Sequence, residues 1–478
     1  MRDIRSTGRR ITAALAAAVT VTGLSAGVAR PAAAAPAPWH AVGWSDSATG
    51  TSINNAMFAT NADIMRNDGL TGKGVGVALV DTGVAPVAGL TGGNVVNGPD
   101  LSFDSQDPAK RFVDGNGHGT HLAGIIAGRA SGSFGGGVAP GAKLTSVKVG
   151  AASGAVDVSQ VIAAIDWVVA HRNDDTANRI RVLTLSYGTD GVQSSLLDPL
   201  QFAVENAWRA GIVVVVASGN TGGNTPLVNP AANPYVLSVG ALDLRGTSDM
   251  RDDQVTAFTN RGTTARRVDI SVPGRTIISL RAPGSAIDTA YPAARVGTQL
   301  FKGSGTSQAA AMLAGNVALL LQQRPALTPD QVKALLKSGS QPVASTGTMD
   351  QGLRRLDVFA ASYPTAPTTK QAWARGTGRG TLEGARGSVH VSDGAATLTG
   401  ESTVWGRYDA TAWSTASAAG TAWSGGSWMG HALTGTTWTT SGGMAAWSGR
   451  AWSGGTWSGR AWSGRAWSSV SWLGTTWS

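Results

Sequence analysis

Four short motifs carry side chains that together have the chemistry to cleave an acyl bond. Val80-Asp81-Thr82-Gly83 holds a carboxylate, Asn116 to His121 (NGHGTH) an imidazole at His118, and Gly303 to Ala311 (GSGTSQAAA) an alcohol at Ser307. A serine activated by an imidazole, which a carboxylate orients in turn, is a common nucleophilic arrangement. Ala217-Ser218-Gly219-Asn220 adds an amide donor of the type that stabilises an oxyanion.

Each motif also has a common structural interpretation. A strand-end Asp often caps a turn, a Ser at a helix start often serves as the N-cap, and an Asn in a Gly-rich loop often forms a turn. His118 and His121 are spaced to bind zinc on a helix, but there is no Cys and no acid at the zinc-peptidase spacing. We therefore assign His118 as a general base and His121 as a buried supporting residue.

The motifs lie where predicted strands meet predicted helices. Short aliphatic runs predict strands at Val75–Val80, Leu144–Val149, Val182–Leu185, Ile212–Val216 and Val236–Val239. Helical patterns occupy His118–Ala127, Val158–Ala170, Leu196–Ala210 and the apolar run after Ser307, and Thr328-Pro329-Asp330 opens another helix. This alternation predicts an α/β fold with a mainly parallel central sheet flanked by helices. Asp81 and Asn220 then lie at the carboxyl edge of the sheet, where such folds build their sites.

The motifs DTG, HGTH, SGN and GTS, in this order, resemble the subtilisin (subtilase) family of serine peptidases. The resemblance covers Ile64 to Val343, about three-fifths of the chain. It implies a subtilisin-like three-layer domain and a serine endopeptidase that works through an acyl-enzyme. It also implies that Asp81 orients His118, that His118 takes the proton of Ser307, and that Asn220 and the Ser307 backbone N–H receive the oxyanion.

The resemblance further implies a substrate site on two segments. Ser186, Tyr187 and Gly188 would pair with an extended peptide, and Ala217, Ser218 and Gly219 would line the pocket for the residue before the cut. The small residues Ala217 and Gly219 predict room for a large apolar or aromatic side chain. The alternative for Tyr187 is simple packing.

Composition divides the chain into four parts. Residues 1–35 have a basic start, the apolar run Ile11 to Ala29 and Ala33-Ala34-Ala35 before Pro36, which predicts a signal peptide. A membrane anchor is the alternative, and the Sec and twin-arginine routes both remain open. Residues 36–61 have no clear periodicity and are expected to be an N-terminal arm on the domain surface, 62–363 the peptidase domain, and 364–478 a linker and Trp-rich repeat tail.

The tail has low complexity, with Trp at a spacing of five from Trp447 to Trp477. Five matches neither the strand nor the helix period. Three interpretations are open: a disordered Trp/Gly/Ser segment as the default, Trp stacking on cell-wall polysaccharide, or a five-residue β-solenoid. If the Trp side chains stack on wall polysaccharide, an alternative function is a catalytically quiet wall-binding protein.

Net charge limits the possible binding partners, and the absence of Cys limits how the fold can be stabilised. Of the net charge of +9, five basic residues and one acid lie in residues 1–35, and eight basic residues and four acids follow Thr365, so the central domain is nearly neutral. This disfavours nucleic acid as a partner. The family resemblance implies polypeptide substrates, and we expect a monomer. The chain has no Cys, so no disulfide can form. Catalysis needs no cofactor. Structural calcium is an option that the loop acids Asp100, Asp104, Asp107 and Asp114 raise without fixing a metal site.

Overall fold

The computed structural model describes residues 50–344, 350–368, 370–392, 397–432 and 458–459, which all belong to one unit, Pro38–Ser478. The predicted signal peptide and the regular Trp repeat, apart from residues 458 and 459, lie outside the described residues. In the described part of the chain, no helix has the length and apolar character to cross a membrane.

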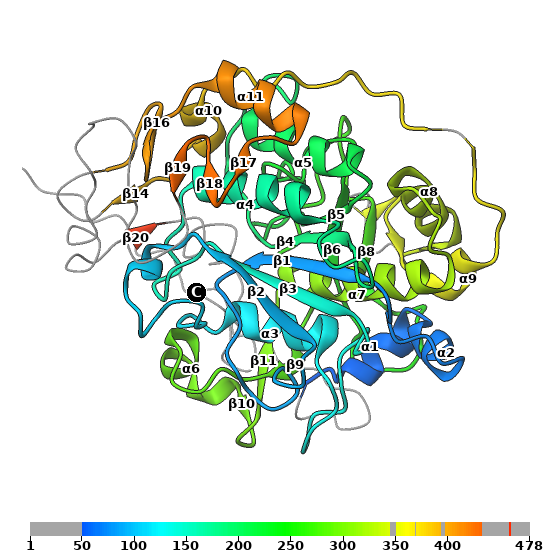
Figure 1. The fold of residues 1–478 in the computed structure, drawn as a ribbon. Coiled ribbons are helices and arrows are strands. Elements are labelled where there is room, and N and C mark those ends of the chain that lie inside the picture. Colours follow the sequence, from blue (N-terminus) through cyan, green and yellow to red (C-terminus); the bar gives the residue numbers. More distant parts are fainter. Residues whose placement is uncertain (1–49, 345–349, 369, 393–396, 433–457, 460–478) are drawn as a thin grey trace, which may run out of the picture. The chain divides into compact units, whose positions relative to one another are not determined.

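Aliphatic, β-branched runs form the centre of one large sheet (Figure 1). Its strands are β1 (Gly76–Asp81), β2 (Val95–Asp100), β3 (Lys143–Lys148), β4 (Ile180–Leu185), β5 (Val213–Ala217), β6 (Leu237–Asp243), β7 (Gln254–Val255), β8 (Ile270–Pro273), β12 (Gln341–Pro342) and β13 (Arg354–Arg355). The order is β12-β13-β8-β6-β5-β4-β1-β3-β2, with β7 paired to β6. All neighbours from β13 to β2 are parallel. The predicted α/β fold is confirmed.

Helices cover both faces of this sheet because its central strands are buried on both sides. The helices up to residue 362 are α1 (Ile53–Ala59), α2 (Ala62–Asn67), α3 (His118–Ala127), α4 (Val158–His171), α5 (Pro199–Arg209), α6 (Ala286–Ala290), α7 (Thr306–Gln323), α8 (Pro329–Gly339) and α9 (Val358–Ser362), with the short 3-10 helices η1 (Phe103–Gln106) and η2 (Pro292–Ala294). Helices α3 and α7 pack together on one face, and α4 and α5 on the other.

A small antiparallel sheet lies against α3. It consists of β9 (Ile277–Leu280), β10 (Arg295–Val296) and β11 (Leu300–Gly303), in the order β10-β11-β9. Residues 281–299 extend from this sheet between β9 and β11, and they carry α6 and η2.

The last part of the N-terminal arm, which was expected on the domain surface, forms a helix with a buried face. Ser52 accepts a hydrogen bond from Asn55 N and caps α1, which buries Ile53, Ala56 and Met57. These positions follow the i, i+3, i+4 spacing of an amphipathic helix. The arm therefore contributes to the core and does not only lie on the surface.

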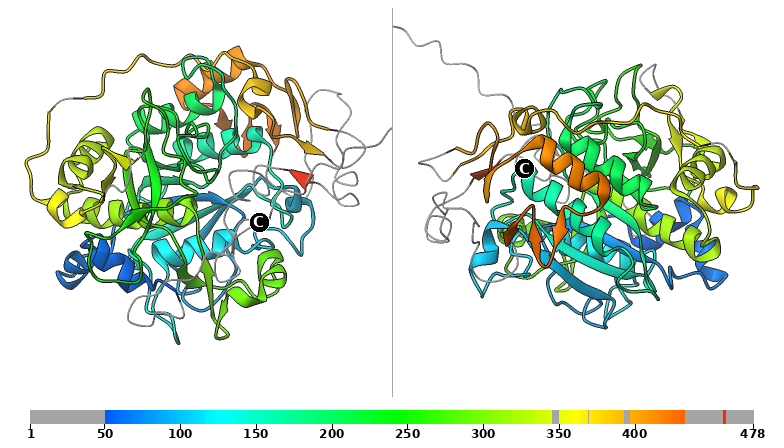
Figure 2. Two further views of the ribbon diagram at one scale, coloured as in Figure 1. Left: turned by 180° about the vertical axis from the view of Figure 1, so that it is seen from behind. Right: turned by 45° about the horizontal axis from the view of Figure 1, so that its top comes forward.

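The first part of the predicted tail is folded onto the domain. Its elements are α10 (Leu382–Arg386), β14 (Val391–Ser392), β15 (Ser402–Thr403), β16 (Gly406–Arg407), α11 (Ala410–Ala419), β17 (Trp423–Ser424), β18 (Ser427–Trp428) and β19 (His431–Ala432). Helix α10 contacts α4 and α5, α11 contacts α5, and β17 contacts α4. Figure 2 shows α11 running over these helices. The default prediction of disorder does not hold for these elements, although the boundary at residue 363 stays a prediction.

Asp166 on α4 is the main anchor of this C-terminal segment. Its Oδ2 accepts hydrogen bonds from the indole N–H groups of Trp413, at 2.8 Å, and Trp428, at 2.9 Å, while Oδ1 accepts one from Ser417 at 2.6 Å. Burial raises the pKa of Asp166 to about 6, against the effect of these donors. The Trp side chains thus contribute both apolar area and polar contacts to the interface.

Trp423 and Trp428 show how a spacing of five between Trp residues can arise in a hairpin. Trp423 and Trp428 are paired across the antiparallel strands β17 and β18, with Ser424 opposite Ser427. Gly425 and Gly426 have φ values of 55° and 80° and form the two-residue turn. In a hairpin of this length, residues i and i+5 face each other. Neither the strand period nor the helix period predicts this pairing.

We predict that Asp166→Ala lowers the free energy of unfolding by about 2–5 kcal/mol, because two buried indole donors lose their acceptor. Urea unfolding measures the change. The matched control is Asp330→Ala, which removes the acceptor of Trp208 Nε1, 2.8 Å away, at a half-buried position. The control should lose less stability. Equal losses would contradict the anchoring role of Asp166.

Candidate active site

Asp81 and His118 meet at the carboxyl edge of the large sheet. Asp81 is the last residue of β1, and His118 is the first residue of α3. His118 Nδ1 lies 2.8 Å from Asp81 Oδ1, and both side chains have no exposed area. The sequence placed these two residues at this edge, and the structure brings them into direct contact.

Gly119 makes the approach of α3 to β1 possible. A Cβ atom at this position would lie 2.1 Å from Gly83 O and 3.2 Å from Asp81 Oδ1. Gly119 N instead donates to Thr82 Oγ1 at 2.9 Å. Any larger residue would push His118 away from the carboxylate.

Burial sets the charge state of this pair. It lowers the pKa of His118, which favours the neutral ring that can accept a proton. It raises the pKa of Asp81, against the hydrogen bonds from Thr82 to that carboxylate. An Asp81 carboxylate 2.8 Å from Nδ1 also favours the Nδ1–H tautomer, which leaves Nε2 as the basic nitrogen.

Ser307 and Asn220 lie near each other at the start of α7. Asn220 Oδ1 accepts hydrogen bonds from Thr306 N and Thr306 Oγ1, both at 2.9 Å, and these bonds orient the amide. The position of a Cβ atom built on Gly305 lies 3.5 Å from Asn220 Nδ2 and 3.6 Å from Ser307 N. Both nitrogens therefore lie close to one point, which Gln308 Oε1 also approaches at 2.7 Å, at the positive end of an 18-residue helix.

The chain matches a protein-family model over most of its length. The Subtilase family model (Peptidase_S8) matches residues 72–373.

This chain belongs to the subtilase family, a family of serine peptidases.

Relatives of this subtilase include bacterial proteases. Serine protease AprX of Bacillus subtilis is 42% identical over 298 residues, which cover 60% of this chain and 66% of AprX. Subtilisin Savinase of Lederbergia lenta is 33% identical, over 61% of this chain and 93% of Savinase. Fervidolysin from Fervidobacterium pennivorans, a solved structure, has a TM-score of 0.53 and 29% identity, over 66% of this chain and 46% of fervidolysin. The match to AprX thus spans slightly less than two thirds of that relative.

The predicted substrate segments of this subtilase follow two adjacent strands. Ser186, Tyr187 and Gly188 come directly after β4, and Ala217 ends β5, with Ser218 and Gly219 next along the chain. Because β4 and β5 are parallel neighbours, both segments lie at the same edge as Asp81. Their role in binding stays a prediction.

Val228 packs against one glycine of each segment. A Cβ atom on Gly188 would lie 2.3 Å from Val228 Cγ2, and one on Gly219 would lie 2.8 Å from Val228 Cγ1. The half-buried Val228 therefore occupies space beside both glycines. The predicted room for a large apolar or aromatic side chain stays a prediction.

Asp114 is a residue of the site that the sequence interpretation missed. Its carboxylate accepts hydrogen bonds from Gly117 N at 2.7 Å, Thr120 N at 2.7 Å and Thr82 Oγ1 at 2.9 Å. It thereby shapes the turn that presents His118, and burial raises the pKa of Asp114 to about 6. An Asp just before the NGHGTH motif was the available signal.

The loop acids proposed as calcium ligands do not gather around one point. Asp100 accepts hydrogen bonds from Ser102 N and Phe112 N, and Asp104 pairs with Lys148 at 3.0 Å. Asp107 pairs with Lys110 at 3.0 Å, and Asp114 binds the turn before His118. Throughout the described ranges, no three His, Cys, Asp or Glu residues form a metal-binding group. These four carboxylates do not fit a calcium site in this arrangement.

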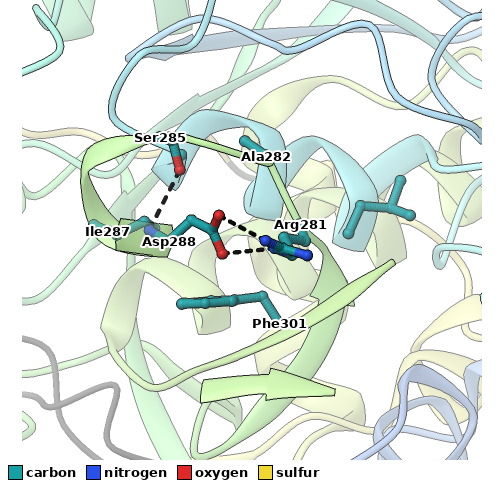
Figure 3. A pocket seen from close by; sticks show the side chains of 8 residues that line it. Arg281, Ala282, Ser285, Ile287, Asp288 and Phe301 are labelled. Atoms are coloured by element: carbon teal, nitrogen blue, oxygen red, sulfur yellow. Dashed lines mark hydrogen bonds and ion pairs between the residues drawn. The ribbon is translucent and has the colours of Figure 1, made fainter. Parts of the chain in front are cut away.

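The insertion between β9 and β11 is fastened to the loop before His118. Ala286 N donates to Gly115 O at 2.9 Å, and Ile287 N donates to Asn116 O at 3.1 Å. Figure 3 shows the small pocket beside Gly117, where the Asp288 carboxylate faces Arg281 with nitrogen–oxygen distances of 2.6 and 2.8 Å. This bidentate ion pair stiffens the insertion and so supports the position of His118.

We predict that Thr306→Val, which keeps the shape of the side chain, lowers kcat about tenfold with little change in KM. The hydroxyl that orients Asn220 is lost, whereas complete removal of the donor in Asn220→Ala should cost about 10²–10³ in kcat. Steady-state kinetics on a peptide substrate compares the two variants. A Thr306→Val enzyme with the kcat of the wild type would contradict this role of the hydroxyl.

Proposed function

We propose that this subtilase is a secreted serine endopeptidase that hydrolyses peptide bonds through an acyl-enzyme on Ser307. The buried hydrogen bond between Asp81 and His118 carries the proposal, because a buried carboxylate on one ring nitrogen prepares the other nitrogen to act as a base. The subtilase membership and the protease names of the relatives support it.

The first half of the reaction forms the acyl-enzyme. His118 Nε2 takes the proton from Ser307 Oγ while this oxygen attacks the carbonyl carbon of the scissile bond. The ring becomes positively charged, and Asp81 stabilises that charge at 2.8 Å without itself taking the proton. His118 then donates the proton to the leaving amine, and the peptide C–N bond breaks.

The second half of the reaction hydrolyses the acyl-enzyme and restores the Ser307 hydroxyl. A water molecule gives a proton to His118 and attacks the acyl carbon, and Ser307 recovers its proton when the acid product leaves. In both halves the carbonyl oxygen becomes negative. The Asn220 Nδ2 group and Ser307 N–H are the proposed donors to it, and the hydrogen bonds from Thr306 to Asn220 Oδ1 hold the amide before the charge develops.

The proposed substrate is an extended polypeptide. Ser186 to Gly188 would add the peptide chain as a neighbouring strand, and Ala217 to Gly219 would form the opposite wall of the pocket for the residue before the cut. The small residues Ala217 and Gly219 leave room there for a large apolar or aromatic side chain. Recognition through the main chain is largely independent of the other side chains of the substrate.

A fluorophosphonate probe tests the proposed nucleophile. We expect the wild type to be labelled and Ser307→Ala to remain unlabelled, and we expect Asp81→Asn to lower kcat about 10⁴-fold because the wrong imidazole tautomer is then held. Mass spectrometry of the labelled peptide identifies the modified residue. A folded, mature wild-type protein that is not labelled by the probe would contradict the proposed function.

The proposed secretion depends on residues 1–35, and the proposed wall association depends on the Trp-rich repeat. Removal of residues 1–35 would release the protein from the exporting cell, and the Trp-rich repeat beyond residue 432 is the proposed contact with wall polysaccharide. The catalytically quiet alternative gains no support from the described residues, in which four Trp side chains of the segment beyond residue 363 are buried: Trp405, Trp413, Trp423 and Trp428.

We predict that a chain ending at Ala432 keeps its peptidase activity but loses retention on cell walls. The cut falls after β19, so the described contacts with α4 and α5 are preserved. Sedimentation with purified walls compares the shortened and full-length proteins. Unchanged retention of the shortened chain would exclude the repeat as the wall contact.

A further inference from the structure

The C-terminal segment contacts the loop that continues from the proposed substrate strand. Thr189 Oγ1 donates to Ala385 O at 2.5 Å, and Asn229 Nδ2 donates to the same oxygen at 3.4 Å. Thr189 and Asn229 are themselves joined by two backbone hydrogen bonds, of 2.9 and 3.0 Å. One carbonyl of α10 therefore holds residues that directly follow Gly188 and Val228, which pack against each other.

A second contact fixes the next two residues of that loop. The Asp190 carboxylate accepts hydrogen bonds from Ser388 N at 2.7 Å and Ser388 Oγ at 2.5 Å. A Cβ atom on Gly387 would lie 2.4 Å from Asp190 Oδ1 and 2.6 Å from Gly191 N. The two backbones thus touch, and no side chain fits between them.

The loop has little other burial to keep it in place. Val192 is 97% exposed, and Leu196 and Leu197 are also exposed. A loop with few buried apolar contacts opens at a low cost in free energy. The hydrogen bonds from α10 and its neighbours are therefore a large part of what holds residues 189–191.

Helix α10 is itself rigidly attached to the domain. The Arg386 side chain has no exposed area and pairs with Asp157 at 2.6 Å. Asp157 also caps α4, where it accepts a hydrogen bond from Ser159 N. A buried, hydrogen-bonded ion pair of this kind fixes geometry because either charge alone would be costly in the interior.

We propose that residues 381–388, the α10 segment, position the substrate-binding strand and the pocket of this peptidase. The inference rests on the proposed function, since it assigns a role in the same cleft. By holding Thr189, Asp190 and Asn229, the α10 segment fixes Ser186 to Gly188 and Val228 relative to each other. It thus determines affinity and the preference for the residue before the cut, while Asp81, His118 and Ser307 are unaffected.

The test compares two glycine variants in the full-length protein. Gly387 and Gly400 both have a positive φ, 61° and 62°, so Ala introduces backbone strain at either position. A Cβ on Gly387 collides with the loop, whereas one on Gly400 meets nothing within 4 Å. Gly400→Ala is therefore the matched control for Gly387→Ala.

We expect Gly387→Ala to raise KM about tenfold with kcat changed less than about twofold, because ground-state binding is lost and the chemistry is preserved. The substrates are peptides that differ only in the residue before the scissile bond: Ala, Leu or Phe. Their relative kcat/KM should change in Gly387→Ala but not in Gly400→Ala, and both variants should react with the fluorophosphonate probe at the wild-type rate.

Thr189→Val provides a second variant in case Gly387→Ala fails to fold, since it removes only the hydroxyl bound to Ala385 O. We expect about a threefold rise in KM. Unchanged KM and unchanged preference in Thr189→Val and Gly387→Ala would overturn the proposal. So would a parallel loss of probe labelling and peptide cleavage in folded Gly387→Ala, because the change would then reach the nucleophile.

Hydrogen exchange separates this inference from the proposed function. The amides of residues 189–191 should exchange at least about tenfold faster in Gly387→Ala than in Gly400→Ala. A wild type that neither reacts with the probe nor cleaves peptides contradicts the proposed function, and the exchange rates still decide whether the α10 segment holds the loop. Equal exchange rates in Gly387→Ala and Gly400→Ala would contradict the proposed role of the α10 segment.

Discussion

The hydrogen bond between Asp81 and His118 depends on two chain segments ending at the same place. Strand β1 stops at Asp81, and helix α3 begins at His118, 37 residues later. Gly119 permits the contact, and Asp114 holds the turn that leads into the helix. Since the pair is fully buried, its geometry cannot be adjusted by solvent. The remaining site residues have to be arranged around it.

Parallel strand order makes that arrangement simple. Strands β5, β4 and β1 are neighbours, so Asn220, Ser186 and Asp81 follow or end three adjacent strands at one edge. Helix α7 supplies Ser307 from one face of the sheet. On the other face, α4 carries Asp166 and lies next to its N-cap Asp157, the two buried carboxylates that bind the C-terminal segment. One sheet therefore serves the proposed reaction and the attachment of the segment.

Local sequence patterns predicted the central part of the fold well. The helix expected at His118–Ala127 has those bounds in the structure, and Thr328 caps α8 as expected. Asp81, His118, Ser307 and Asn220 could be assigned because strand ends and helix starts carry clear signals and their order resembles a family. Their catalytic roles remain predictions, although the contact between Asp81 and His118 fits them.

The features that sequence could not supply depend on distant contacts. Asp166 gives no sign that it binds Trp413, 247 residues later, and Val228 lies in a loop whose path the two pocket walls do not reveal. Low-complexity composition suggested disorder, yet Trp423 and Trp428 pair across a turn. The periods of single elements cannot detect such pairing. Asp114 was considered for calcium because acidity, unlike hydrogen-bond direction, can be read from a sequence.

The contact between Thr189 and Ala385 joins residues that are 196 positions apart. A chain made from its N-terminus contains Asp81, His118, Asn220 and Ser307 well before Ala385 has been synthesised. During biosynthesis and export, the groups proposed to break the bond are therefore complete earlier than the support of the loop beside them. If that support governs substrate preference, a nascent chain acquires its discrimination later than its reactivity.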